Sequence, residues 1–225
     1  MLPPQSPDWA QLVYATQGSL TVESPIGERL WYVPAHRALW VPAGLASSLR
    51  LRGAVRLRMI YLHQSLCKRA QETCAINVTP LLHEAILEAA RRSVLPPDVP
   101  LTRLIVELIR AAPSAPLMLP MPRDARALRV ANHLVREPAK RQTLLELGRD
   151  AGAGVRTLER IFARETGMGF AAWRQRLRML EGMRRLLDGD SVAAAADAVG
   201  YESVSAFVVA FKATMGETPG KWLRR

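Results

Sequence analysis

The chain has 225 residues, of which 49% are hydrophobic and 23% charged, a composition typical of folded globular proteins rather than disordered ones. Lysine and arginine outnumber aspartate and glutamate by 31 to 20, which gives a net charge of +11. No apolar run approaches the ~18 residues that a membrane-spanning helix needs. The surplus of positive charge indicates a polyanionic partner, either nucleic acid or an acidic membrane surface, with a generically basic surface as the alternative.

The beginning of the chain and its cysteines bear on where the protein works. Residues 1–5 show neither the basic region nor the apolar stretch of a secretory signal peptide. Two cysteines, Cys67 and Cys74, cannot form a disulfide framework, and their scarcity favours a reducing compartment. We therefore expect a cytoplasmic protein without membrane partners.

The first part of the chain is rich in short β-type runs. Between residues 8 and 63, Val55, Leu57 and Met59 alternate with Arg56, Arg58 and Ile60, the period of a half-buried strand. Turn residues such as Gln17-Gly18 separate the other runs. About six short strands at this spacing predict a small all-β barrel or sandwich.

From Thr79 onward the apolar residues follow a helical period. Two helical faces are expected before a proline-rich segment: first Leu82, Ile86, Ala89 and Ala90, then Leu101, Leu104, Ile105, Leu108 and Ile109. Four prolines between 113 and 122 cannot continue a helix and mark a linker. The expected organisation is a β domain at 1–75, a helical linker or dimerisation segment at 76–112, a Pro-rich linker at 113–123 and an all-α domain at 124–225.

The all-α part repeats one arrangement, helix, glycine-containing turn, helix. A first copy spans residues 144–165 with Thr143 as the expected N-cap, and a second spans 192–211. A longer helix at about 171–187 joins them. Two such units favour DNA binding, because the second helix of each can present its outer face to the major groove.

The second helix of the first unit has an inner and an outer face. Leu158, Ile161 and Phe162 are expected inside, which leaves outside Arg156, Glu159, Arg160 and either Ala163 or Arg164. Eight arginines and three glutamates between residues 154 and 185 concentrate positive charge there. Long donors of this kind suit guanine edges and phosphates. The alternative is a surface amphipathic helix with solvated arginines.

Two motifs carry a resemblance to a known family. Residues 157–170 read TLERIFARETGMGF, and residues 199–207 read VGYESVSAF, followed by Phe211-Lys212 and by GETPGKW at 216–222. In this order and spacing they resemble the tandem helix-turn-helix domain of AraC/XylS transcription regulators, over residues 144–222. Ala195 and Trp222 depart from the usual pattern of that family.

The resemblance implies sequence-specific binding to double-stranded promoter DNA. Carried over residue by residue, the DNA-facing positions of the first unit are Arg156, Thr157, Glu159, Arg160 and Arg164, with Arg156 and Arg160 as the main base readers. Those of the second unit are Val204, Ser205, Val208 and Val209, with Lys212 on the backbone. Because the second set contains no long donor for bases, we expect the first unit to supply most of the discrimination. The alternative is that residues 204–208 contact RNA polymerase or a second protomer.

The N-terminal part resembles, more weakly, the cupin-like arm of a subgroup of this family. The resemblance is carried by QLVYATQGSLTV at 11–22 and RALWVPAG at 37–44. Positions that usually hold histidines there are occupied by residues such as Ser6 and Ser47, so a metal-free barrel is expected. The chain starts close to the first strand, which leaves open whether the barrel is complete. The resemblance implies a regulatory domain that binds a small effector or dimerises.

Other functions have little support in the residues. His36, His63, His83 and His133 have no metal-ligand spacing, and neither a phosphate loop nor a nucleophile elbow is present. We expect no cofactor and no enzymatic activity. A redox role for the two cysteines is the minor alternative to small buried side chains. A metal-dependent cupin enzyme with a DNA-binding tail is the rival hypothesis, and a bound transition metal would distinguish it from a regulator.

Overall fold

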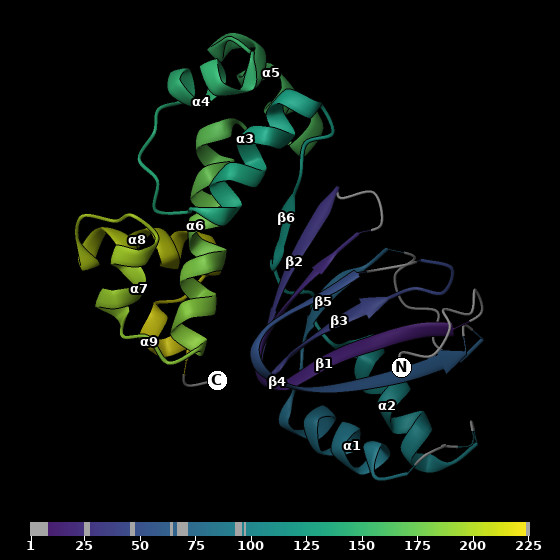
Figure 1. Ribbon diagram of the computed structural model, residues 1–225. Coiled ribbons are helices and arrows are strands. Elements are labelled where there is room, and N and C mark those ends of the chain that lie inside the picture. Colours follow the sequence, from purple (N-terminus) through teal and green to yellow (C-terminus); the bar gives the residue numbers. More distant parts are fainter. Residues whose placement is uncertain are drawn as a thin grey trace. The chain divides into compact units, whose positions relative to one another are not determined.

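The computed structural model divides into two compact units (Figure 1). Unit 1 comprises residues 1–25 and 33–118, and unit 2 comprises residues 26–32 and 119–225. The structure describes residues 9–24, 28–45, 48–63, 65–66, 72–92, 96 and 98–223. Ser6, Ser47 and Cys67, which entered the sequence predictions, lie outside these residues. Among the described residues, no helix is long and apolar enough to cross a membrane.

Six strands form one sheet. The order is β5-β3-β1-β2-β6, and β4 pairs with β1 outside this path. β1 pairs antiparallel with β3 and β4, and β3 with β5. The N-terminal strands β1 to β5 make an antiparallel half-barrel followed by helices, in the order that the sequence predicts, and β6 comes after α2. Their bounds are β1 Trp9–Glu23, β2 Arg29–Pro34, β3 Arg37–Val41, β4 Ser48–His63, β5 Cys74–Asn77 and β6 Met118–Pro120.

Two strands are much longer than the sequence predicts. β1 has 15 residues and β4 has 16, and β1 joins two runs that Gln17-Gly18 was expected to separate. The Gln17-Gly18 step is therefore not a turn between strands. Gly18 has φ 77°, and the β1–β4 register shifts between Ala15 and Gln17 and again between Gln17 and Ser19. A bulge thus bends one continuous strand where a turn was expected.

The burial of β4 also departs from expectation. Its residues from Val55 to Tyr61 all keep partial or full exposure, so the predicted alternation of buried and exposed positions is absent. The reason is positional, because among the described strands β4 pairs with β1 alone and is an edge strand. Side chains on both of its faces therefore remain accessible.

Two helices cover one face of the sheet in unit 1. They are α1 (Pro80–Ala90), which begins at the Thr79 N-cap, and α2 (Pro100–Ala111). Ile86 and Ile109 are fully buried in a core with Leu12, Tyr14, Trp40 and Ile76 of the strands. The predicted face of α2 is partly wrong, since Leu104 is 39% exposed while Thr102 and Val106 are buried.

The residues from Leu119 onward belong to unit 2. The backbone N–H of Met121 donates to the Glu28 carbonyl at 2.7 Å, and the Arg123 guanidinium pairs with the Glu28 carboxylate at 2.6 Å. Trp173 anchors the same segment by donating from Nε1 to the Pro120 carbonyl at 2.6 Å. The end of the Pro-rich stretch, residues 119–123, is therefore held by contacts within unit 2.

The rest of unit 2 is helical and contains the predicted repeat. A short helix, a turn and a second helix occur as α4–α5 and again as α7–α8, and α6 joins the two copies. Thr143 caps α4 in a capping box with Glu146, which confirms it as the N-cap. The helices are α3 Ala125–Arg136, α4 Leu144–Ala151, α5 Val155–Thr166, α6 Phe170–Leu187, α7 Val192–Ala198, α8 Val204–Met215 and α9 Pro219–Trp222.

Each helix-turn-helix unit has its own aromatic core. In the first, the ring centroid of Phe162 lies 5.2 Å from the ring centroids of both Phe170 and Trp173. In the second, Phe207 lies 5.6 Å from both Tyr201 and Phe211. Because α6 contributes residues to both cores, it fixes the outer helices α5 and α8 on one scaffold.

Candidate nucleic-acid interface

The turn of the first unit packs closely against α4. A Cβ atom on Gly148 would lie 2.4 Å from the Ala153 carbonyl oxygen, so only glycine fits at this point of α4. Ala153 itself donates its backbone N–H to the Gly148 carbonyl at 2.8 Å. Gly152 ends α4 in the left-handed conformation with φ 71°. This local geometry sets the direction in which α5 leaves the turn.

The two faces of α5 are as the sequence predicts. Leu158, Ile161 and Phe162 are buried, whereas Arg156, Glu159, Arg160 and Arg164 are exposed. Thr157 lies between the two faces and is partly buried.

The exposed side chains of α5 differ in the hydrogen bonds and ion pairs that they make within the protein. Among the described residues, the guanidinium groups of Arg156 and Arg160 make no hydrogen bond or ion pair. Arg164 is paired with Glu165 at 2.7 Å, although 64% of its side chain is exposed. The carboxylate of Glu159 accepts a hydrogen bond from the Phe170 N–H at 3.3 Å. Arg156 and Arg160 are thus free donors on this face, and Glu159 also supports the start of α6.

The outer face of α8 is chemically different. Val204 is 42% exposed and Val209 71%, with Ser205 also exposed and Val208 partly buried. Phe207 and Phe211 are buried on the inner face, as predicted. Lys212 is exposed one turn further along the helix. Before Lys212, this face therefore presents methyl groups and a hydroxyl but no long donor.

The arginines of α6 are engaged within the protein. Arg174 donates to the backbone carbonyls of Gln142 and Lys140, and Arg178 donates to the carbonyls of Pro138 and Lys140. Burial lowers the pKa of both guanidinium groups. Near the end of the helix, Arg184 and Arg185 form ion pairs with the buried Glu181. The density of arginine in the sequence therefore overstates the charge that α6 offers to DNA.

The loop held by Arg174 and Arg178 also contacts the turn of the second unit. A Cβ atom on Gly200, which has φ +80°, would lie 2.7 Å from the Ala139 carbonyl oxygen. The Arg141 guanidinium pairs with the Glu202 carboxylate at 2.9 Å. The loop between α3 and α4 thus links the two helix-turn-helix units. This link could not be predicted from the sequence, because the partners of Arg174 and Arg178 are backbone carbonyls, which every residue carries.

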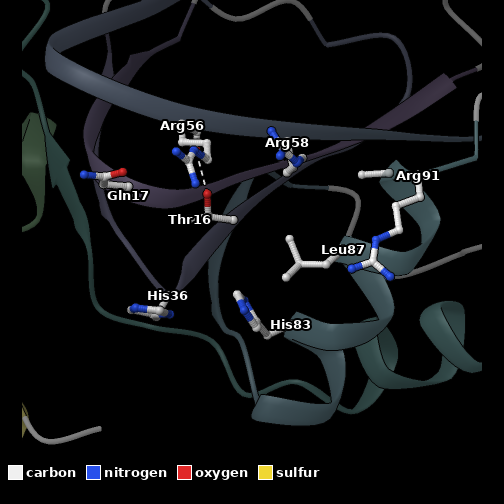
Figure 2. A pocket seen from close by; sticks show the side chains of 9 residues that line it. Thr16, Gln17, His36, Arg56, Arg58, His83, Leu87 and Arg91 are labelled. Carbon is white, nitrogen blue, oxygen red and sulfur yellow. Dashed lines mark hydrogen bonds between the residues drawn. The ribbon is translucent and has the colours of Figure 1, made fainter.

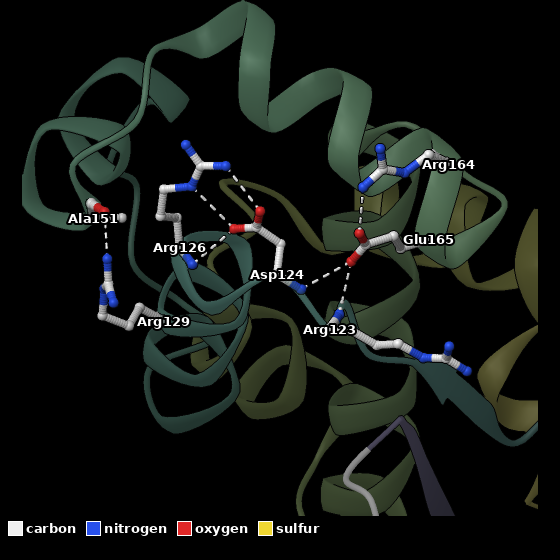
Figure 3. Close-up of polar contacts among 7 residues, drawn as sticks. All are labelled: Arg123, Asp124, Arg126, Arg129, Ala151, Arg164 and Glu165. Atoms are coloured by element: carbon white, nitrogen blue, oxygen red, sulfur yellow. Dashed lines mark hydrogen bonds and ion pairs between the residues drawn. The ribbon is translucent and has the colours of Figure 1, made fainter.

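A second polar network joins α3 to the first unit (Figure 3). Glu165 accepts hydrogen bonds from the backbone N–H groups of Arg123 and Asp124. Asp124 is the N-cap of α3, and its carboxylate accepts a hydrogen bond from the backbone N–H of Arg126. The hydrogen bonds from Arg126 hold the pKa of the Asp124 carboxyl well below its usual range. Arg129 donates to the Ala151 carbonyl at the end of α4. These contacts position α4 and α5 on the rest of unit 2.

The histidines and Cys74 lie outside α5 and α8. His63 lies 2.8 Å from the Ser65 hydroxyl, and His133 lies 3.0 Å from the Gln142 side-chain oxygen. Cys74 is a free, partly buried thiol at the edge of the core of unit 1. Within the described ranges, no three His, Cys, Asp or Glu side chains are grouped as metal ligands would be. His36 and His83, far apart in sequence, have ring centroids 5.8 Å apart.

Comparisons with known proteins bear on this arrangement. A family model described as a helix-turn-helix domain matches residues 147–225. The transcriptional regulator NimR of Escherichia coli is 28% identical over 219 residues, covering 96% of this chain and 80% of that protein. These matches agree with the resemblance of the sequence motifs to the AraC/XylS family of transcription regulators. That is a family of DNA-binding regulators and not of enzymes.

Two further matches are confined to part of the chain or of the relative. The regulator RipA of Corynebacterium glutamicum is 34% identical over 128 residues, covering 57% of this chain and 36% of that protein. The DNA-binding domain of AdpA, solved with a target DNA, is 24% identical and covers 44% of this chain and 90% of that domain, with a TM-score of 0.42. The chain thus spans most of NimR but about a third of RipA.

Proposed function

We propose that the two helix-turn-helix units bind double-stranded promoter DNA together and that the first unit reads most of the base sequence. One observation carries this proposal: Arg156 and Arg160 are exposed and unpaired on the outer face of α5, whereas the corresponding face of α8 has no long donor. Arginine can bond two acceptors on guanine at once, while valine can only contact a thymine methyl group. The two units therefore differ in what they can distinguish.

The remaining residues of the interface would position the protein on DNA. Arg164 on α5, which pairs with Glu165, and Lys212 on α8 are suited to phosphate contacts, which fix register without reading sequence. Thr157 and Ser205 can bond either a base edge or a phosphate. The Glu159 side chain would lie near a base edge, and its hydrogen bond from the Phe170 N–H would still support the start of α6. Two units bound on one DNA face would occupy successive major-groove segments, roughly 34 Å apart.

A second function for α8 is favoured by one observation, the 71% exposure of Val209 beside the exposed Val204. An apolar face of this kind also fits a protein partner, either RNA polymerase or a second copy of the chain. This use of the face is an alternative to DNA contact, because residues seated in a major groove cannot contact a protein at the same time.

We further propose that the N-terminal half-barrel is a regulatory domain whose small-molecule effector changes DNA binding. In this proposal the β domain at 1–75 and the helical segment at 76–112 provide regulation or dimerisation. The linker at 113–123 connects them to the domain at 124–225, which binds DNA. The protein would act in the cytoplasm, where promoter DNA is found. Neither a metal nor a catalytic step has a place in this function.

The test is selection of binding sites from a pool of random duplexes with the purified full chain. The expected result is an enriched motif with one strongly and one weakly specified half, and an affinity that falls with salt. Each phosphate neutralised contributes about −0.9 to the slope of log K against log salt. Recovery of no motif, or an affinity independent of salt, would contradict the proposal.

A further inference from the structure

A cavity of about 540 Å³ lies in unit 1 between the β4 side of the sheet and helix α1 (Figure 2). Arg56 and Arg58 enter it from β4, and His83, Leu87 and Arg91 enter it from α1. Its volume is within the roughly 300–1,000 Å³ of small-molecule sites. All of its lining residues belong to unit 1, so its shape depends on that unit alone.

The charge of the lining is one-sided. Among the described residues that line the cavity, none is an aspartate or a glutamate. Arg91 is already paired with Glu88 at 3.2 Å. Among the described residues, however, Arg56 and Arg58 have no carboxylate partner, and the Arg58 side chain donates to the Leu57 carbonyl at 3.0 Å. Two guanidinium groups therefore face this space without a counter-charge.

The histidines at the floor of the cavity are held in place. The Tyr14 hydroxyl lies 2.5 Å from Nδ1 of His83, so the other ring nitrogen of His83 is left for a ligand. His36 sits in the left-handed region with φ 62°, and its backbone N–H donates to the Ala15 carbonyl at 3.2 Å. A strained backbone held by its surroundings is a recurring feature of binding sites. Burial, together with the nearby His83 and Arg37, lowers the pKa of His36.

We propose that this cavity binds a small organic anion, with its carboxylate or phosphate group at Arg56 and Arg58 and its apolar part against Leu87. Arginine recognises both oxyanions through paired hydrogen bonds. The apolar side chain of Leu87 offers surface that a bare inorganic ion would leave unused. The inference rests on the proposed function in one respect: it identifies this anion as the effector of the regulator.

The experiment measures thermal unfolding of the full chain at constant ionic strength with benzoate, phenyl phosphate, the neutral analogue benzamide, or inorganic phosphate. A ligand at about five times its Kd should raise the Tm of a chain this size by about 2–4 °C. We expect this shift with benzoate or phenyl phosphate, and none with benzamide. The larger of the two shifts shows whether the site prefers a carboxylate or a phosphate.

Substitutions connect the shift to the cavity. The variants Arg56→Gln and Arg58→Gln should each reduce it, and the double variant should abolish it. Arg103→Gln is the matched control, because Arg103 is exposed on α2 outside the cavity. The inference is overturned if neither organic anion exceeds benzamide, if inorganic phosphate shifts the Tm as much as they do, or if the shift survives in the double variant.

The DNA affinity of the same variants separates this inference from the proposed function. A chain that binds its DNA motif but shows no anion-dependent shift refutes the anion site and leaves DNA binding intact. A chain that shows the shift but selects no DNA motif refutes the proposed function and leaves the anion site intact. When both hold, benzoate or phenyl phosphate should change DNA affinity in the parent chain but not in the double variant, and an unchanged parent would refute the effector role.

Discussion

The carboxylate of Glu165, in the last turn of α5, accepts a hydrogen bond from the backbone N–H of Asp124 at 3.0 Å (Figure 3). The same carboxylate accepts from the N–H of Arg123 at 2.8 Å and pairs with Arg164. The hydrogen bonds and the neighbouring guanidinium lower the pKa of Glu165 below its ordinary value. The helix that carries the proposed base readers is thereby tied to the start of α3.

We predict that Glu165→Gln lowers the free energy of unfolding by about 0.5–2 kcal/mol at neutral pH, because an amide accepts these hydrogen bonds less well than a carboxylate. The folded pKa is depressed, so the stabilisation is complete above the ordinary carboxyl range and is lost as the pH falls through the folded pKa. Urea unfolding between pH 7 and pH 3 should therefore show a weaker pH dependence in the variant. Glu202→Gln, at an 82% exposed side chain, is the control and should change stability little. Equal effects of the two substitutions would contradict this role.

Gly200→Ala should destabilise the chain by about 1–3 kcal/mol, for two reasons that act together. Gly200 has φ +80°, and its new Cβ atom would meet the Ala139 carbonyl oxygen at 2.7 Å. Gly220→Ala is the matched control, because nothing lies within 4 Å of its Cβ position. Thermal unfolding of the two variants measures the difference. A Gly200→Ala chain as stable as the control would show that the loop at Ala139 is not packed against this turn.

The sequence predicts elements better than it predicts how they connect. The two helix-turn-helix units, the Thr143 cap and the inner residues of α5 follow from periodicity and capping chemistry, which are local properties. The continuous strand β1 was not predicted, since Gly18 at φ 77° can make either a turn or a bulge. Only pairing with β4, a long-range property, decides between them.

The same limit applies to the candidate sites. The exposed arginines of α5 could be predicted, because the spacing of apolar residues fixes which side of a helix is outside. The cavity in unit 1 could not, because His36 and His83 are 47 residues apart and only the sheet and α1 bring them together. The arginines of α6 were read as surface charge, whereas folding turns Arg174 and Arg178 toward backbone carbonyls.

Arg178→Gln should therefore affect stability more than it affects DNA electrostatics. Removal of its hydrogen bonds to the Pro138 and Lys140 carbonyls should cost about 1–3 kcal/mol of stability. The salt slope of DNA binding should stay unchanged, whereas Arg164→Gln should reduce its magnitude by about 0.9. Anisotropy titrations of a labelled duplex at several salt concentrations give both slopes. A loss of about one unit of slope in Arg178→Gln would identify that residue as a phosphate contact.

Arg160→Ala should weaken binding to the preferred duplex by about 1–3 kcal/mol and relax the preference at particular base pairs. Lys212→Ala is the comparison, since a phosphate contact should weaken all sequences alike. Competition with duplexes altered at single base pairs measures both effects. A loss in Arg160→Ala that is equal for every duplex would show that Arg160 contacts the backbone instead.

The unequal roles of the two helix-turn-helix units can be tested by substituting every base pair of a selected duplex in turn and measuring the affinity of the full chain. Arg156 and Arg160 face outward from α5, whereas Val204, Ser205 and Val209 face outward from α8. Strong G·C preferences, each costing about 1–3 kcal/mol when changed, should therefore be confined to one half of the site, with weak preferences in the other. Equally strong G·C preferences in both halves would contradict the account.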